Sequence, residues 1–535
     1  MMKVLSRIEK RNGRKVLVVD EKPFIMLAGE VHNSNSSSVA YMEGVYDQAD
    51  ALGMNCLLIP VTWELVEPEE GVFDFSLMDA LIMQARERGK KLGFLWFGAW
   101  KNAQSYYAPE WVKTDLNRFK RAQMEKGKNF IRMENFHGMP YTSLSYLCEE
   151  TRKADARAFG RLMRHLKEVD GEICTVITVQ VENETGVMGN AREMSDEADA
   201  LFAADVPQGF ADYMRKSTQT MVPDVKASVE RGADNGNWEA VFGDCAEEIF
   251  SAYHIASYVN AVAAAGKAEY PLPMTANCWL DKGEEPGLYP SGGPVSRMME
   301  VWNYCAPNID VIAPDIYVRN FLEVCDEYTR RDNPLFIPEC ATHSYAGSRE
   351  VYAVGHYHAM CYSPFGFEDI GKPFTAQQSF LFGMDVEDPA LQTPQSVEEY
   401  YWFTHNLREM MPLLTDKYGT SDLQAVSCER KEENRLLFGT YGFQIDLASQ
   451  LVTGRNGVCM ILKESEDTFY VMVHAGGFTY FSVDSEKPNV DVLLLEEGYF
   501  KDGVWKAGRR LNGDEVTTLV YQEPTLLKLK LFAYE

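Results

Sequence analysis

The stretch VITVQVENETG, residues 176–186, decides how this chain folds. Its first six residues are apolar or β-branched except for Gln180, the composition of a short strand buried on both faces of a parallel sheet. The run then ends abruptly in the polar residues Glu182, Asn183 and Glu184. Parallel barrels present functional side chains at the carboxyl ends of their strands, where the loops meet solvent. We therefore expect Glu184 to stand at such a strand end.

A second apolar run also ends in a carboxylate. Residues 335–339 read LFIPE, so Glu339 occupies the same kind of position as Glu184. Two carboxylates on two strand ends suit cleavage of a glycosidic bond, in which one is the general acid and base and the other the nucleophile. The alternative is that each is only a solvated acid at a strand end. A general acid must keep its proton near neutral pH, so we expect burial and a nearby carboxylate to raise the pKa of Glu184.

Further runs have the same form, and helical segments separate them. The expected strands cover residues 23–34, 55–61, 92–97, 176–181, 274–279, 309–317, 335–339 and 360–367. Helices are expected at residues 40–52 and 153–169, and after Ser76, where apolar residues recur at helical spacing. Eight strands that alternate with helices predict an α/β fold, the (β/α)8 or TIM barrel.

The sequence pattern changes after the barrel, from strands that alternate with helices to short strand-like runs. Residues 1–390 are expected to hold the barrel and an N-terminal hairpin turning at Asn12-Gly13, and residues 391–415 a linking helix. Residues 416–535 are expected to form a smaller all-β accessory domain. Its strand-like runs, separated by turn residues, lie at residues 436–443, 468–473 and 525–531.

Composition narrows the classes of function. The 535 residues are 46% hydrophobic and 24% charged, as in an ordinary globular protein, and the formal net charge is −27. Such a charge repels a nucleic-acid backbone, so no nucleic-acid partner is expected. No stretch reaches transmembrane length, and the N-terminus has no apolar core of signal-peptide length, so no membrane partner is expected either.

The cysteines indicate a reducing compartment. There are eleven of them, an odd number without zinc-like spacing. Cys56, Cys174 and Cys278 lie inside apolar runs, as small core residues do. We therefore expect reduced thiols and a cytoplasmic location.

Five motifs in order resemble glycoside hydrolase family 35, and within it the bacterial β-galactosidases with a distinct C-terminal β domain. They are GEVHNS at 29–34, VTWE at 61–64, LWFGAWKN at 95–102, QVENE at 180–184 and SPFG at 363–366. The resemblance covers nearly the whole chain. It implies a retaining (β/α)8 glycosidase with Glu184 as acid/base after the fourth strand and Glu339 as nucleophile after the seventh. Thr185 stands where animal and plant members carry tyrosine, so their aglycone preference transfers less well.

The resemblance and the strand ends also suggest residues that bind the substrate. Asn183 is expected to bond the sugar 2-hydroxyl, or else only to brace the strand end. Glu30, His32 and Asn33 end the first strand and are candidates for sugar hydroxyls, with a turn-stabilising role as the alternative for Asn33.

Several aromatic residues are further candidates for the site. Trp63, Trp96, Trp100 and Trp279 are candidates for stacking on sugar faces, although such residues are usually core. Tyr317 ends the sixth strand and could hydrogen-bond the nucleophile, or simply pack.

Other motifs carry no chemistry of their own. Glu182 would share a face with Glu184 if the strand stayed regular, and is taken as structural or sugar-binding. His356 and His358 lack a convincing third ligand, so no metal site is expected. Residues 291–294, SGGP, lack the glycine spacing and lysine of a phosphate-binding loop and are interpreted as a turn.

The sequence thus predicts a retaining, exo-acting β-glycosidase, foremost a β-galactosidase that trims oligosaccharides without a cofactor. One alternative keeps the machinery but transfers the glycosyl group to another sugar. Another is a different sugar specificity, such as a β-glucoside or an α-L-arabinoside, and a third is a barrel that binds carbohydrate without catalysis. A homo-oligomer is also an expectation, because accessory domains often pack between subunits.

Overall fold

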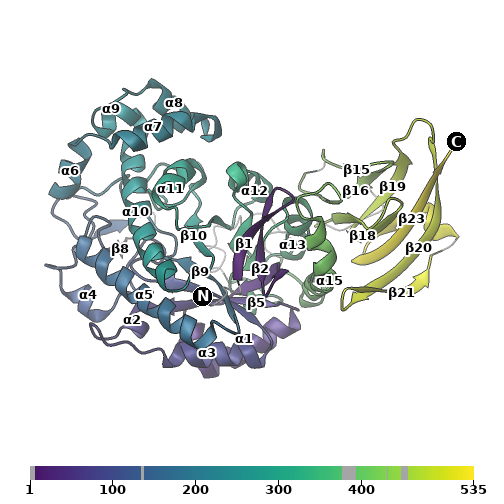
Figure 1. Ribbon diagram of the computed structural model, residues 1–535, viewed down its shortest axis with the longest axis horizontal. Helices are drawn as coiled ribbons and strands as arrows, with labels where there is room; N and C mark the ends of the chain where they lie inside the picture. Colours follow the sequence, from purple (N-terminus) through teal and green to yellow (C-terminus); the bar gives the residue numbers. More distant parts are fainter. Residues whose placement is uncertain (1–5, 134–137, 376–392, 431, 448–455, 512) are drawn as a thin grey trace. The chain divides into compact units, whose positions relative to one another are not determined.

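The computed structural model describes residues 6–133, 138–375, 393–430, 432–447, 456–511 and 513–535. The chain divides into two compact units, and each is described by itself below (Figure 1). The first unit holds the start of the chain with residues 33–42 and 58–315. The second holds residues 8–32, 43–57 and 316–535.

Eight strands close into a barrel in which each strand neighbours the next one along the chain. They are β4 (Met26–Glu30), β5 (Cys56–Thr62), β6 (Lys91–Phe97), β9 (Val176–Val181), β10 (Met274–Trp279), β11 (Val311–Ile316), β12 (Phe336–Cys340) and β13 (Cys361–Pro364). Nearly every strand residue is buried, as expected where helices cover the outer face of a parallel sheet. The predicted barrel and the positions of its eight strands are confirmed.

Helices of the first unit follow the barrel strands. They include α2 (Trp63–Val66), α3 (Ser76–Glu87), α5 (Glu149–Asp170), α10 (Ala246–Glu269) and α11 (Met299–Cys305), whereas α1 (Val39–Ala51) is divided between the two units. The longest two, α5 and α10, pack side by side (Figure 1). Gly266 permits this approach, because a Cβ atom there would lie 2.2 Å from the ring of Phe159.

Two insertions extend the first unit. The one after β6 contains α4 (Glu110–Thr114), β7 (Ile131–Met133) and β8 (Met139–Tyr141). The one after β9 contains α6 (Asp196–Ala203), α7 (Gln208–Lys216), α8 (Pro223–Arg231) and α9 (Trp238–Phe242). Its aromatic residues pack on one another, with the rings of Phe210, Trp238 and Tyr253 5–6 Å apart. Because Tyr253 lies on α10, this cluster packs the insertion against that helix.

The second unit contains the remaining barrel strands and an N-terminal sheet. The sheet consists of β1 (Ser6–Arg11), β2 (Arg14–Val19) and β3 (Lys22–Pro23). Asn12 and Gly13 both have positive φ, 47° and 81°, as the predicted tight turn requires. Helices α12 (Phe321–Tyr328) and α13 (Ala346–Tyr352) follow β11 and β12.

Helix α15 (Val397–Lys417) links to an all-β C-terminal domain. The helix ends at Lys417, two residues beyond the range predicted for it, and accommodates Pro412 in its interior. One sheet has the order β14 (Leu423–Ser427), β17 (Val458–Lys463), β18 (Thr468–His474), β23 (Thr525–Tyr534), β20 (Asn489–Lys501), β21 (Val504–Arg510). The other has the order β15 (Arg435–Phe438), β16 (Tyr441–Asp446), β19 (Gly476–Ser482), β22 (Val520–Tyr521).

The two sheets share one hydrophobic core, so the predicted accessory β domain is confirmed. Phe443 of one sheet packs edge-on against Phe469 of the other, with ring centroids 5.0 Å apart. The run at residues 436–443, read from the sequence as one strand, is instead a hairpin that turns at Gly439, where φ is 74°. Across the ranges given above, no helix is both long and apolar enough to cross a membrane.

Candidate active site

The loop after β9 leaves the regular strand at once. Strand β9 ends at Val181, and Glu182 and Glu184 both have positive φ, 64° and 43°. Such φ values are unusual for residues with side chains and are often found at functional sites. Gly186 completes the turn at φ 147°, where a Cβ atom would lie 2.5–2.7 Å from Pro290. The expectation that Glu182 and Glu184 share a strand face is therefore wrong, because the strand does not continue through them.

Buried polar groups hold Glu184 in this turn. The Glu184 side chain is 5% exposed, and its backbone N–H donates to Asn277 Oδ1 at 3.0 Å. Its carbonyl oxygen accepts a hydrogen bond from the Ala103 N–H at 2.9 Å. The Asn277 amide, on β10, donates in turn to Asp315 Oδ2, on β11, at 2.8 Å. Asn277 thus ties the Glu184 loop to the Asp315 carboxylate.

Asn277 and Asp315 were not among the predicted site residues. Their strands were predicted correctly, but the residues singled out were those at the expected strand ends, Trp279 and Tyr317. The signal in the sequence is a polar side chain inside an apolar run, and the structure buries both residues: Asn277 is 1% and Asp315 2% exposed. A buried amide or carboxylate must be hydrogen-bonded or hold a function, so such positions merit attention.

Glu339 lies on β12 with its side chain 4% exposed. The Tyr317 hydroxyl donates to Glu339 Oε2 at 2.7 Å, so the hydrogen bond expected for Tyr317 is present. Tyr317 also packs with Phe365 against Ala341, two residues beyond Glu339. This packing fixes the hydroxyl that faces the carboxylate.

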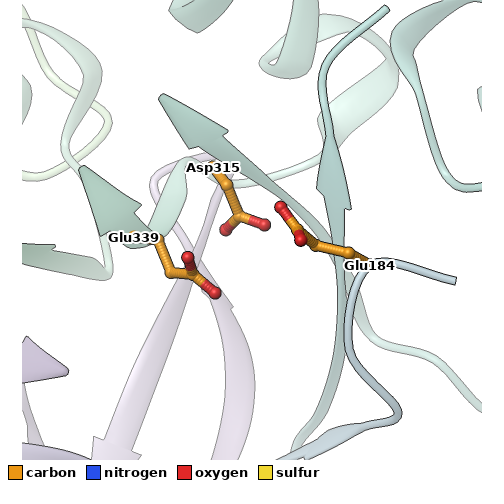
Figure 2. A group of neighbouring side chains, drawn as sticks. All are labelled: Glu184, Asp315 and Glu339. Atoms are coloured by element: carbon orange, nitrogen blue, oxygen red, sulfur yellow. The ribbon is translucent and has the colours of Figure 1, made fainter. Parts of the chain in front are cut away.

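The carboxylates of Glu184, Asp315 and Glu339 converge (Figure 2). One oxygen from each lies within 4.8 Å of the others, at the carboxyl ends of β9, β11 and β12. Among the residues that the structure describes, these three carboxylates lie close enough together to hold a cation. Acidic groups gather in this way without an ion, so the cluster by itself assigns no metal.

A second carboxyl pair supports the same loop. Asp155 on α5 accepts hydrogen bonds from Trp96 Nε1 at Oδ1 and from the Tyr258 hydroxyl at Oδ2, both at 2.9 Å. Glu182 accepts one from the Trp100 backbone N–H at 2.8 Å. Burial, and then the charge of Asp155, raises the pKa of Glu182 well above its usual value. The raised pKa favours the protonated form of Glu182 beside the Asp155 carboxyl group.

Gly98 makes room for this pair. A Cβ atom at Gly98 would lie 2.6 Å from Glu182 Oε1 and 2.7 Å from Asp155 Oδ1. The pair acts on the loop through Trp100, whose N–H binds Glu182 and whose carbonyl accepts from the Asn183 N–H at 3.3 Å. The backbone of Asn183, beside Glu184, is thereby held in place.

The substitution Glu182→Gln tests whether the fold raises the pKa of Glu182. Glu182 binds its proton more tightly in the folded than in the unfolded protein. The wild type should therefore lose stability as the pH rises above 4.5, the ordinary pKa of a glutamate carboxyl group. Glutamine stays neutral and keeps the shape. We expect the free energy of unfolding of the variant to rise relative to that of the wild type as the pH rises. The change is up to about 1.4 kcal/mol per pH unit while one proton is involved. Urea unfolding at pH 5, 7 and 9 measures this, and a difference independent of pH would contradict it.

The predicted stacking tryptophans differ in position. Trp63, Trp96 and Trp100 are buried, and their indole N–H groups donate to Glu67, Asp155 and Ser143 at 2.9–3.0 Å. These positions favour packing over stacking on a sugar. Trp279, at the end of β10, is half-buried.

The residues after β4 are also placed. Glu30 is buried, and its carbonyl accepts from the Gly366 N–H at 2.8 Å. The His32 ring lies 2.9 Å from Asp369 Oδ2 and edge-on to Phe365. Asn33 lines a hollow of about 200 Å³. Ser34, Thr62, Glu64 and Tyr107 contribute polar groups to the same hollow. The sugar-binding roles of these residues stay predictions.

His356 and His358 are packing residues in this structure. The His356 ring stacks on Tyr352 with centroids 4.7 Å apart, and the His358 ring stacks on Tyr418 at 5.0 Å. His358 Nδ1 accepts from the Gly419 N–H at 3.0 Å. Burial lowers the pKa of His358 to about 4, which keeps its imidazole neutral.

Comparison with known proteins gives partial sequence matches. Residues 16–91 match the model of glycosyl hydrolases family 35, and residues 405–520 match a domain of unknown function, DUF5597. A β-galactosidase from Xanthomonas manihotis is 42% identical over 59 residues, which are 11% of this chain and 10% of that protein. The chain thus matches about a tenth of the length of this curated relative.

Solved structures of similar fold are distant in sequence. A β-galactosidase from Bacillus circulans sp. alkalophilus has a TM-score of 0.45 and 11% identity, over 94% of this chain and 99% of that one. A cold-adapted β-galactosidase from Rahnella sp. R3 has a TM-score of 0.42 and 15% identity, over 64% of this chain and 50% of that one. Residues 16–91 are thus similar to glycosyl hydrolases family 35, the family that the five sequence motifs resemble.

Proposed function

We propose that this protein is a retaining, exo-acting β-glycosidase that removes terminal β-galactosyl residues from oligosaccharides. One observation carries the proposal: Glu184 and Glu339 end two strands of one barrel, and their carboxylates converge. This is the arrangement that glycosidic cleavage by two carboxylates needs. The match of residues 16–91 to family 35 supports the same reaction class.

The proposed reaction has two steps. Ionised Glu339 attacks the anomeric carbon and forms a glycosyl ester, while Glu184 gives its proton to the departing glycosidic oxygen. Glu184, now a carboxylate, takes a proton from water, whose oxygen attacks the same carbon and releases Glu339. The Tyr317 hydroxyl, 2.7 Å from Glu339 Oε2, orients the nucleophile. Asn183 is the proposed partner of the sugar 2-hydroxyl.

Retention of configuration is proposed on the resemblance to family 35, and the close approach of the two carboxylates is compatible with it. Retaining enzymes keep their two carboxyl groups roughly 5–5.5 Å apart, and inverting enzymes roughly 6.5–9.5 Å apart to admit a water. One oxygen of Glu184 lies within 4.8 Å of one oxygen of Glu339, an approach of single atoms that the shorter spacing of the two groups allows.

The wild-type protein tests the proposal directly. We expect hydrolysis of aryl β-galactoside to exceed that of aryl β-glucoside, and the first galactose released to be the β-anomer in proton NMR spectra. A β-linked galactotriose labelled at its reducing end should yield the labelled disaccharide before labelled galactose, since an exo-acting enzyme starts at the non-reducing end. Release of the α-anomer would overturn retention, and a folded protein that binds galactose but cleaves neither glycoside would favour the binding barrel.

Two further properties are proposed with the function. None of the eleven cysteines, all of which lie in the described part of the chain, forms a disulfide, and this supports the proposal of a reducing, cytoplasmic location. A homo-oligomer is proposed on the ground given above, that accessory domains often pack between subunits. Light scattering coupled to gel filtration decides this, and a mass of 60.6 kDa would show a monomer instead.

A further inference from the structure

The segment that follows Glu339 is held by residues far along the chain. We call residues 341–345, between β12 and α13, the β12 loop. Its first three residues are buried, yet their partners do not come only from neighbouring barrel strands. The Gln395 N–H donates to the Thr342 carbonyl at 3.1 Å, and the Ser344 N–H donates to the Thr393 carbonyl at 2.8 Å. The segment before α15 thus satisfies backbone groups of the loop.

An ion pair ties the same region to the C-terminal domain. Arg349, on α13, is 3% exposed, and its guanidinium binds Glu429 through two bonds, Nε to Oε2 at 3.0 Å and Nη2 to Oε1 at 2.6 Å. Glu429 follows β14 of the C-terminal domain. Arg349 Nη1 also lies 3.2 Å from Nε2 of His343, in the β12 loop. A buried guanidinium needs such a planar, two-point partner, so Glu429 fixes Arg349 and Arg349 fixes His343.

A second contact from the same domain reaches the loop independently. Asn456 lies just before β17, and its Nδ2 donates to the Ser344 carbonyl at 2.7 Å. Its Oδ1 lies 3.3 Å from Nε2 of His474, at the end of β18. Glu429, Asn456 and His474 all lie within residues 405–520, the part matched to a domain of unknown function.

The β12 loop in turn contacts the groups around Glu339. Ala341, the first residue of the loop, packs against Tyr317 and Phe365. The Tyr317 hydroxyl donates to Glu339 at 2.7 Å. A shift of the loop would therefore move both the end of β12 and the hydroxyl that faces the nucleophile.

We propose that the C-terminal domain holds the β12 loop, and through it Glu339, in the reactive position. Glu429 and Asn456 are positioning residues, since neither contacts the carboxylate itself. The kinetic part of this inference rests on the proposed role of Glu339 as nucleophile. The structural part, that Glu429 and Asn456 order the β12 loop, does not.

The test compares Glu429→Gln with a matched control, Glu497→Gln. Glu497 also binds an arginine through two bonds in the C-terminal domain, Arg509 at 2.8 and 3.1 Å, but on the β20–β21 hairpin. Amide hydrogen exchange of a peptide covering residues 341–349 is the first readout. We expect exchange at least about tenfold faster in Glu429→Gln and unchanged in Glu497→Gln, because local opening follows the contacts that are removed.

Kinetics on aryl β-galactoside is the second readout. We expect kcat of Glu429→Gln to fall by about 10- to 100-fold, as small misplacements of reacting groups do, with KM within about twofold. Asn456→Ala should act in the same direction, and it serves if Glu429→Gln does not fold. Thermal unfolding of all variants shows which of them are folded.

The outcomes separate the inference from the proposed function. Unchanged exchange in folded Glu429→Gln and Asn456→Ala would overturn the inference. Faster exchange with unchanged kcat would show that the domain orders the loop without positioning the nucleophile, and would overturn the kinetic part. If the wild type cleaves no glycoside, the proposed function fails and the kinetic part with it, while exchange still decides the structural part.

Discussion

Glu339→Gly is expected to lose hydrolysis of aryl β-galactoside and to regain part of it when azide is added. Without the carboxylate, no covalent intermediate forms, and kcat should fall by on the order of 10⁴- to 10⁶-fold, as it does when a covalent nucleophile or its partner is removed. The glycine leaves a space on the face of the sugar that Glu339 attacks. Azide can enter that space and attack the anomeric carbon in place of the carboxylate, with Glu184 still present to protonate the leaving group.

The stereochemistry of the azide product decides the role of Glu339. One displacement by azide inverts the configuration, so a β-galactoside should yield the α-galactosyl azide, which NMR spectroscopy identifies. Glu339→Gln is the control that keeps the volume and the contact with Tyr317 but leaves no space for azide, so it should be inactive and not rescued. Activity close to that of the wild type in a folded Glu339→Gly would remove Glu339 from the reaction.

The barrel could be predicted because each strand carries its own evidence. The composition of a run such as VITVQV favours a strand buried on both faces, and a polar residue marks where the chain leaves the sheet. Both glutamates proposed as catalytic were visible for the same reason, as carboxylates at the ends of apolar runs in the sequence. The C-terminal β domain followed from short strand runs with turn residues, although the turn inside residues 436–443 was overlooked.

Other parts of the site could not be predicted from local sequence. The positive φ of Glu182 and Glu184 depends on tertiary contacts, such as the Asn277 side chain that accepts from the Glu184 N–H. The partner of Glu182 is Asp155, 27 positions earlier on a different element, and no local pattern joins the two. For tryptophans, sequence indicates an aromatic side chain near a strand end but not whether it faces the sugar or the protein interior.

The described contacts give the two proposed catalytic glutamates different kinds of support. The Glu184 loop depends on buried polar groups close in space, Asn277 and the Asp155–Glu182 pair. The end of β12 depends on a loop that Asn456 contacts directly and Glu429 holds through Arg349. Asn456 lies 112 residues after its partner Ser344, and Glu429 lies 80 residues after Arg349. Substitutions in the C-terminal domain are therefore expected to weaken attack by Glu339 more than they weaken proton transfer by Glu184.

Glu184→Gln is expected to slow the reaction according to how much the leaving group needs a proton. Glutamine keeps the shape and the backbone bond to Asn277 but can neither donate nor accept the transferred proton. For a β-galactosyl disaccharide, whose leaving alkoxide is strongly basic, kcat/KM should fall by about 10²- to 10⁴-fold, the usual contribution of general acid catalysis. For 2,4-dinitrophenyl β-galactoside, whose leaving group departs without a proton, kcat/KM should change little.

The second step completes the argument for Glu184. With the activated substrate the glycosyl ester on Glu339 should form quickly and then accumulate, because no general base remains to activate water, so a burst of dinitrophenol should precede slow turnover. Azide needs no general base and should accelerate that turnover, giving the β-galactosyl azide, the anomer opposite to that from Glu339→Gly. An equal loss on both substrates, or an α-azide product, would contradict an acid/base role for Glu184, because only two successive displacements return azide to the β face.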